Sequence, residues 1–207
     1  MNKARNPMRK GGENLSMEQS DVVRELRQEL EAGYPDSVKI LDILNDIRSR
    51  EQKKQTAEER EKAEKAKREK KEIKNVVSEH FRQIEEEFKE RADEFFSISE
   101  EKRQKKALII SLHLVLNGLK TNQIRRFLSV LQEIRAKQRK GASADELNAS
   151  ILRIRPVLIY AARNKQVEPL LRIVDRILPF LNDKNFEDFY YFVQAIVAYH
   201  KFLGGGD

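Results

Sequence analysis

The sequence has no cysteine, and only 5 prolines and 8 glycines interrupt its 207 residues. The lack of cysteine excludes a disulfide framework, a thiol nucleophile and a cysteine-rich zinc site. No stretch approaches the roughly 20 uninterrupted apolar residues that a membrane-spanning helix needs. No apolar run follows the basic residues near the start, so a secretory signal is not expected. These absences predict a cytoplasmic protein that makes no membrane contact.

Charge is abundant and unevenly distributed. The chain has 41 Lys and Arg against 34 Asp and Glu, a formal net charge of +7. Residues 1–99 hold 22 basic and 23 acidic side chains, whereas residues 100–203 hold 19 basic and 10 acidic ones. A polyanion would therefore be attracted to the second half of the chain. Improved solubility is the alternative explanation of the same excess.

Apolar residues recur at helical spacing, and no window of several residues alternates strictly as a β-strand would. The predicted fold class is therefore all-α, with a C-terminal five-helix bundle preceded by an extended helical N-terminal region. We expect five segments: a disordered arm (1–15), a helical hairpin (16–50), a charged helical spacer (51–74), an amphipathic coiled-coil-like helix (75–98) and a basic helical bundle (99–203).

Capping residues and prolines predict where individual helices begin, end and bend. Ser16 with Gln19, Thr56 with Glu59 and Ser97 with Glu100 have the spacing of capping boxes. We further expect Pro35 at the start of the second helix, Thr121 as a cap, and Pro156 as a kink in a helix spanning 144–163.

The spacer and the helix after it differ in their apolar content. Residues 51–74 contain almost no large apolar side chain, which predicts a helix solvated on every face. Glutamates lie among the basic residues of Lys65–Lys71 and nearly cancel their charge, which argues against a nucleic-acid-binding patch there. An apolar seam then follows at steps of three and four, and it needs a partner, either the C-terminal domain or another copy. The seam consists of Ile73, Val77, Phe81, Ile84, Phe88, Ala92 and Phe95.

Residues suited to catalysis or metal binding are sparse. His80, His113 and His200 are isolated, without a second histidine at metal-ligand spacing. His113 lies among leucines and a valine, which is typical of a histidine that packs between helices. The sequence therefore predicts no catalytic residue, no metal and no cofactor.

Nucleic-acid binding has better support in the basic half. Several cations lie near predicted helix ends, where side chains and free amides can converge on phosphates. Neutralisation of about four phosphates on a single strand predicts a slope near −3 for log K against log salt. The alternative is that these side chains pair with acids. The aromatic residues of 186–199 are expected in the core rather than as base-stacking platforms. The candidate RNA-binding residues are Lys120, Arg125, Arg126, Arg153, Arg155, Arg163 and Lys165.

Three motifs in the basic half resemble those of one family: TNQIRRFL at 121–128, RPVLIYAAR at 155–163, and KNFEDF at 184–189 with AIVAYHK at 195–201. The family is the small helical subunit of the type III-A CRISPR effector, the Csm complex. The resemblance implies a non-catalytic five-helix bundle in an antiviral ribonucleoprotein. It would stack in several copies beside other subunits and contact target RNA along the guide–target duplex.

The resemblance also implies which residues contact RNA, namely Arg125 and Arg126 and, in addition, Arg155 and Arg163. The segment before about residue 95 exceeds the usual length of the family. A hypothesis of another class stays open: a coiled-coil scaffold that binds only protein through residues 73–96 and does not bind RNA.

Overall fold

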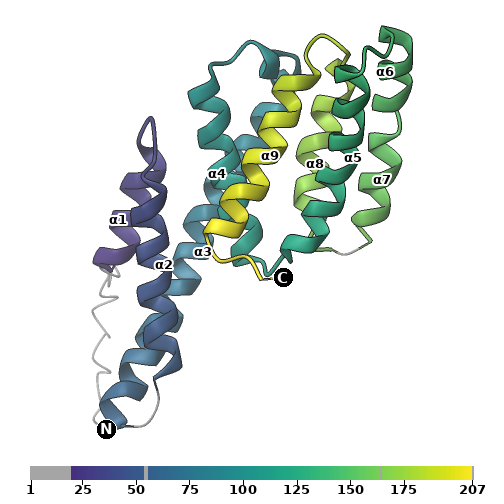
Figure 1. The fold of residues 1–207 in the computed structure, drawn as a ribbon. Helices are drawn as coiled ribbons and strands as arrows, with labels where there is room; N and C mark the ends of the chain where they lie inside the picture. Colours follow the sequence, from purple (N-terminus) through teal and green to yellow (C-terminus); the bar gives the residue numbers. More distant parts are fainter. Residues whose placement is uncertain (1–19, 54–55, 164, 207) are drawn as a thin grey trace, which may run out of the picture.

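The structure, a computed structural model, describes residues 20–53, 56–163 and 165–206, and the regular secondary structure in these ranges is entirely helical, with no strand. The predicted all-α class is confirmed. Two short 3₁₀ helices, Ala92–Phe96 and Leu178–Phe180, follow α3 and α8. The α-helices of Figure 1 are α1 (Asp21–Glu31), α2 (Ser37–Gln52), α3 (Ala57–Arg91), α4 (Glu100–Leu116), α5 (Thr121–Arg139), α6 (Ala144–Ile151), α7 (Ile154–Ala161), α8 (Glu168–Ile177) and α9 (Phe186–Phe202).

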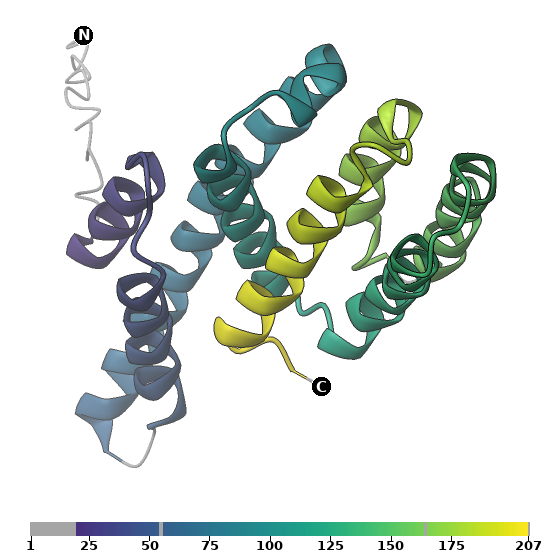
Figure 2. The same cartoon turned by 45° about the horizontal axis from the view of Figure 1, so that its top comes forward.

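The first helices form an arm that projects from the rest of the molecule (Figures 1 and 2). Helix α2 runs back along the first half of α3, and α1 packs on α3 further along. The proposed capping box at Ser16 lies outside the described residues, and α1 begins after Ser20. Pro35 does not start α2, because Asp36 is its N-cap and accepts hydrogen bonds from the backbone N–H groups of Val38 and Lys39.

The charged segment of α3 is not solvated on every face, so that prediction was wrong. The predicted capping box of Thr56 and Glu59 does open α3, which then continues without a break to Arg91. Ala63 and Ala66 are only 1% and 0% exposed in the face that meets α2. Alanine is small enough to let two helices approach closely, and a search for large apolar residues overlooks such a face.

The apolar seam of α3 finds its partner within the chain. All seven seam residues are buried, and the second half of α3 packs on α4 and α8. His113 of α4 stacks on Phe81 with ring centroids 4.0 Å apart and an angle of 7° between the planes. Of the two partners considered for the seam, the C-terminal domain is therefore the one observed.

Helix α9 supplies the centre of the C-terminal bundle. It lies between α4 and α5 (Figure 1). Phe186, Phe189 and Phe192 are at most 1% exposed, and each fully buried aromatic side chain contributes on the order of 2 kcal/mol through burial. The prediction that these aromatic residues belong to the core is confirmed for Phe186, Phe189, Tyr190 and Phe192, whereas Tyr199 is partly buried against the core and Tyr191 is 45% exposed.

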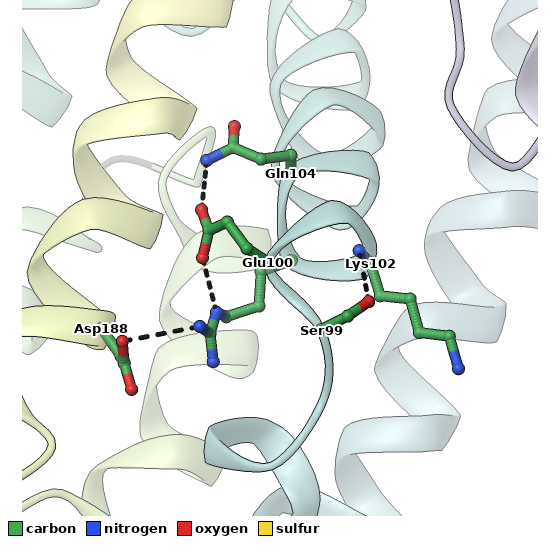
Figure 3. Close-up of polar contacts among 6 residues, drawn as sticks. Ser99, Glu100, Lys102, Gln104 and Asp188 are labelled. Carbon is green, nitrogen blue, oxygen red and sulfur yellow. Dashed lines mark hydrogen bonds and ion pairs between the residues drawn. The ribbon is translucent and has the colours of Figure 1, made fainter.

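Several predicted helix ends need correction. Ser99, not Ser97, caps α4; its hydroxyl accepts a hydrogen bond from the Lys102 N–H at 3.4 Å (Figure 3). Thr121 is the first residue of α5 rather than its cap. The expected kinked helix over 144–163 is two helices, α6 and α7, because the chain breaks at Leu152 and Arg153. Residues 100–202 therefore contain six α-helices where five were predicted.

Polar contacts fix the start of α4 to α9. The guanidinium of Arg103, which is 8% exposed, donates to Glu100 at 3.0 Å and to Asp188 of α9 at 3.5 Å (Figure 3). The Gln104 side-chain amide donates to the other Glu100 oxygen at 2.6 Å. These contacts hold the two central helices together at the end of the bundle opposite the C-terminus.

Candidate nucleic-acid interface

The first cations of the candidate interface lie where α5 begins. Ile124 and Phe127 point into the core, so Arg125 and Arg126 between them face outward and are exposed. Lys120, which immediately precedes the helix, is exposed as well. The 3.6-residue repeat of the helix therefore presents these cations to solvent at one end of the bundle.

Helix α7 brings two further cations to the same end. It packs against α5 and runs in the opposite direction, so the end of α7 lies beside the start of α5 (Figure 1). Arg163 and Lys165 follow the last turn of α7, and both are exposed. The guanidinium carbon of Arg163 lies 4.7 Å from the ring centroid of Tyr160, close enough for a cation–π contact. We call Lys120, Arg125, Arg126, Arg163 and Lys165 the bundle-end cations.

Most bundle-end cations have no carboxylate partner. Within the part of the chain that the structure describes, Lys120, Arg126, Arg163 and Lys165 make no ion pair. By contrast, the Arg103 side chain pairs with acids at the other end of the bundle. Within the described residues, exposed cations without an ion pair also lie at the opposite end, among them Lys102, Arg139, Lys140 and Lys184, so the bundle-end cations are one of two groups of available positive charge.

The C-terminal tail holds the start of α5 in place. The Thr121 N–H donates to the Gly206 carbonyl at 2.7 Å, and the Thr121 hydroxyl donates to the Gly205 carbonyl at 3.1 Å. The same hydroxyl lies 3.2 Å from Nδ1 of the buried His200. An Arg48 Nη donates to the Leu203 carbonyl at 2.9 Å, so the tail also contacts α2.

Two glycines allow this contact. Gly204 has φ +84°, and a Cβ there would lie 2.5 Å from Arg48 Nη1. A Cβ on Gly205 would lie 2.1 Å from His200 Cε1 and 2.8 Å from the His200 carbonyl oxygen. Sequence reasoning treated these glycines only as the end of the last helix. Three consecutive glycines directly after a helix were the signal of a closely packed tail.

Two predicted site residues lie away from the bundle-end cations. Arg155 forms a bidentate ion pair with Asp175 of α8, in which two guanidinium nitrogens donate to the two carboxylate oxygens at 2.6 and 3.0 Å. The hydrogen bonds and the negative charge of Asp175 raise the Arg155 pKa above its usual value. Arg153 instead lines a shallow hollow of about 610 Å³ together with Lys137 and Lys140 of α5. The seven candidates therefore do not form one surface.

The histidines belong to the packing of the bundle. Burial lowers the pKa of His113 to about 4, with further lowering by the positive charges of Lys74 and Arg172. Burial also lowers the pKa of His200. The prediction that His113 packs between helices is confirmed by its stacking on Phe81. Among the described residues, no group of three or more His, Asp or Glu side chains is arranged to hold a metal ion.

The comparison with protein families decides the identity of the basic half. The family model described as Csm2 Type III-A matches residues 99–206, about half of the chain. The chain belongs to the Csm2 family. The match begins at Ser99, the cap of α4, and covers α4 to α9 with the tail and all bundle-end cations. No curated protein matches the chain.

Membership of the Csm2 family makes the chain a small subunit of the type III-A Csm effector complex, and its partners include other subunits of that complex. The resemblance noted in the three sequence motifs is thereby confirmed. The arm formed by α1, α2 and the first half of α3 lies outside the matched residues. None of the helices in the described ranges has the length and apolar character needed to cross a bilayer.

Proposed function

We propose that this Csm2-family chain is a non-catalytic RNA-binding subunit that contacts the backbone of target RNA along the guide–target duplex in antiviral defence. The observation that carries the proposal is that Lys120, Arg126, Arg163 and Lys165, which make no ion pair within the described residues, gather at one end of the bundle inside the family-matched region. Cations of this kind bind phosphates wherever the backbone passes. Sequence specificity would come from base pairing to the guide rather than from this protein.

The arrangement suits backbone contact better than base recognition. Arginine presents a planar fork of donors that matches a phosphate, and lysine adds a mobile point charge. Exposed aromatic side chains that could stack on bases are few at this end, where Tyr160 already faces Arg163. In this proposal, each copy binds a short stretch of RNA weakly, and several stacked copies bind a long strand together.

The proposal gives different roles to the C-terminal bundle and to the helices before it. In our proposal residues 99–203 form the RNA-binding bundle, and the N-terminal helices extend from it. In this proposal two copies do not pair through the seam of α3, because the seam residues are already buried against α4 and α8. A scaffold that binds only protein through residues 73–96 therefore lacks an available apolar surface.

Charge reversal at α5 tests the proposal. The full chain with Arg125→Glu and Arg126→Glu should bind labelled single-stranded RNA more weakly, and its salt slope should be shallower by about 1.4, two contacts at roughly 0.7 each. The matched control carries Lys102→Glu and Lys184→Glu, two exposed cations at the opposite end of the bundle. Equal RNA binding by the α5 variant and the control, with unchanged helicity, would refute the assignment.

A further inference from the structure

A stripe without acidic residues runs along the outer face of α3, in the part of the chain that precedes the family match. Its members follow one another at steps of three and four, so they share one side of the helix. The buried residue Ile73 lies on the opposite side. The stripe consists of Arg68, Lys71, Asn75, Ser78 and Arg82, with Lys74 directly beside it.

The cations of this stripe are unpaired. Arg68, Lys71, Lys74 and Arg82 are all exposed, and within the described ranges none of them makes an ion pair with a carboxylate. The Arg82 side chain donates to a backbone carbonyl, that of Ser78, at 3.3 Å. These cations therefore face solvent without a carboxylate at ion-pair distance.

The structure also removes the glutamates that lie among these cations in the sequence. Glu69 is 3% exposed and binds Arg50 of α2 at 2.7 Å. Glu79 faces α1, where it pairs with Arg27 at 3.6 Å. Glu72 is half-buried. The glutamates that separate these cations in the sequence therefore lie off the stripe, with Glu69 turned toward α2 and Glu79 toward α1.

The part of α3 that carries the stripe lies near the end of α4. Lys70 and Ile73 of α3 line one hollow of about 270 Å³ together with Gly118, two residues before Lys120. This hollow lies on the side of α3 away from the stripe, so the turn that presents Lys71 and Lys74 to solvent contacts the bundle through its other face. From Arg68 to Arg82 the stripe extends about 21 Å, since 14 residues each rise about 1.5 Å.

We propose that Arg68, Lys71, Lys74 and Arg82 form a second RNA-backbone site, which we call the α3 ridge, and that it lengthens the RNA contact of each copy beyond the family-matched bundle. The inference rests on the proposed function, because the ridge is taken to bind the same strand as the bundle-end cations. The ridge reads no bases: four point charges on one helix face recognise phosphates of any sequence. The N-terminal arm would then position the ridge, through packing of α1 and α2 on α3.

Neutralising the ridge in the full chain tests the inference. The ridge variant carries Arg68→Gln, Lys71→Gln and Arg82→Gln. The control variant carries Lys65→Gln, Lys102→Gln and Lys184→Gln, which removes the same net charge from exposed positions off the ridge. The measurement is the affinity for a labelled single-stranded oligouridylate over a series of salt concentrations.

The ridge variant should show a log K–log salt slope shallower by about 2, three lost contacts at roughly 0.7 each, whereas the control should keep the slope of the unchanged chain. Equal shifts in both variants would overturn the inference, because net charge alone would then explain the effect. An unchanged slope in the ridge variant would also overturn it and would point to an acidic protein surface as the partner of α3.

The α5 variant with Arg125→Glu and Arg126→Glu, measured in parallel, separates the two proposals. If it loses affinity while the ridge variant does not, only the α3 ridge is refuted. If neither variant differs from the unchanged chain, or the unchanged chain does not bind the oligouridylate at low salt, the proposed function is refuted as well.

Discussion

Gly205→Ala should open the C-terminal tail and destabilise the bundle. The added Cβ would lie 2.1 Å from a His200 ring carbon and 2.8 Å from the His200 carbonyl oxygen, distances that no small shift relieves. The tail must move away, and Thr121 then loses the hydrogen bonds from its N–H to Gly206 and from its hydroxyl to Gly205. Each lost bond costs about 1 kcal/mol.

The expected loss in the free energy of unfolding is therefore about 2–3 kcal/mol, since the buried hydroxyl is also left without its acceptor. For a chain of this size the melting temperature should fall by roughly 5–10 °C, because each kcal/mol shifts it by about 2–4 °C. Thermal unfolding followed by circular dichroism measures the shift.

Gly206→Ala is the matched control, because a Cβ there meets nothing within 4 Å. Its melting temperature should equal that of the unchanged chain. A Gly205→Ala variant that melts with the control would refute the conclusion that the tail holds the start of α5.

Three further changes test the packing of the arm and the bundle. Ala66→Leu should lower the free energy of unfolding by about 1–3 kcal/mol in urea titrations, because it overfills the α2–α3 contact, whereas Ala198→Leu on the exposed side of α9 should have little effect. Arg50→Met should cost about 2–4 kcal/mol by leaving the buried Glu69 carboxylate unpaired, and a cost below 1 kcal/mol would contradict the importance of this pair. The His113 pKa is about 4 in the folded chain and about 6.5 in the unfolded chain. Between these pH values the unfolded state binds more protons, so the free energy of unfolding should fall as the pH drops from 6.5 to 4. His113→Phe should reduce this loss, by up to about 3 kcal/mol, and an identical pH profile would show that His113 titrates normally.

Helical periodicity predicted the positions of the helices well, because burial of a stripe of apolar side chains is a local property of the sequence. Gly118 and Gly141 follow α4 and α5 with φ +74° and +81°, the left-handed conformation in which glycine commonly ends a helix. Exact starts were harder to predict where two caps compete. Ser97 and Ser99 both precede acidic residues, but Ser97 closes the 3₁₀ turn, where its hydroxyl donates to the Glu94 carbonyl at 2.8 Å, and Ser99 caps α4.

The break before α7 illustrates a different error. Proline was expected to kink a continuous helix, but Pro156 is the third residue of α7. In the first turn of a helix the missing N–H has no intrahelical partner to lose. Ending α6 and starting α7 near Arg153 therefore costs less than a kink would.

For the candidate site, the sequence predicts which basic side chains are exposed but does not predict which of them form ion pairs with carboxylates. The phase of α5 requires Arg125 and Arg126 to face outward once Ile124 and Phe127 are buried. The pairing of Arg155 with Asp175 depends on how α7 meets α8, which no local pattern determines. The docking of Gly205 and Gly206 on Thr121 likewise joins residues more than 80 positions apart.

Crosslinking of target RNA in the assembled effector complex, followed by mapping of the crosslinked peptides, tests the central claim most directly. The account predicts crosslinks in the peptides around Lys120–Arg126 and Arg163–Lys165, at the end of the bundle where α5 starts and α7 ends. Crosslinks confined to the opposite end, near Lys102 and Lys184, or an absence of crosslinks to this subunit, would contradict it.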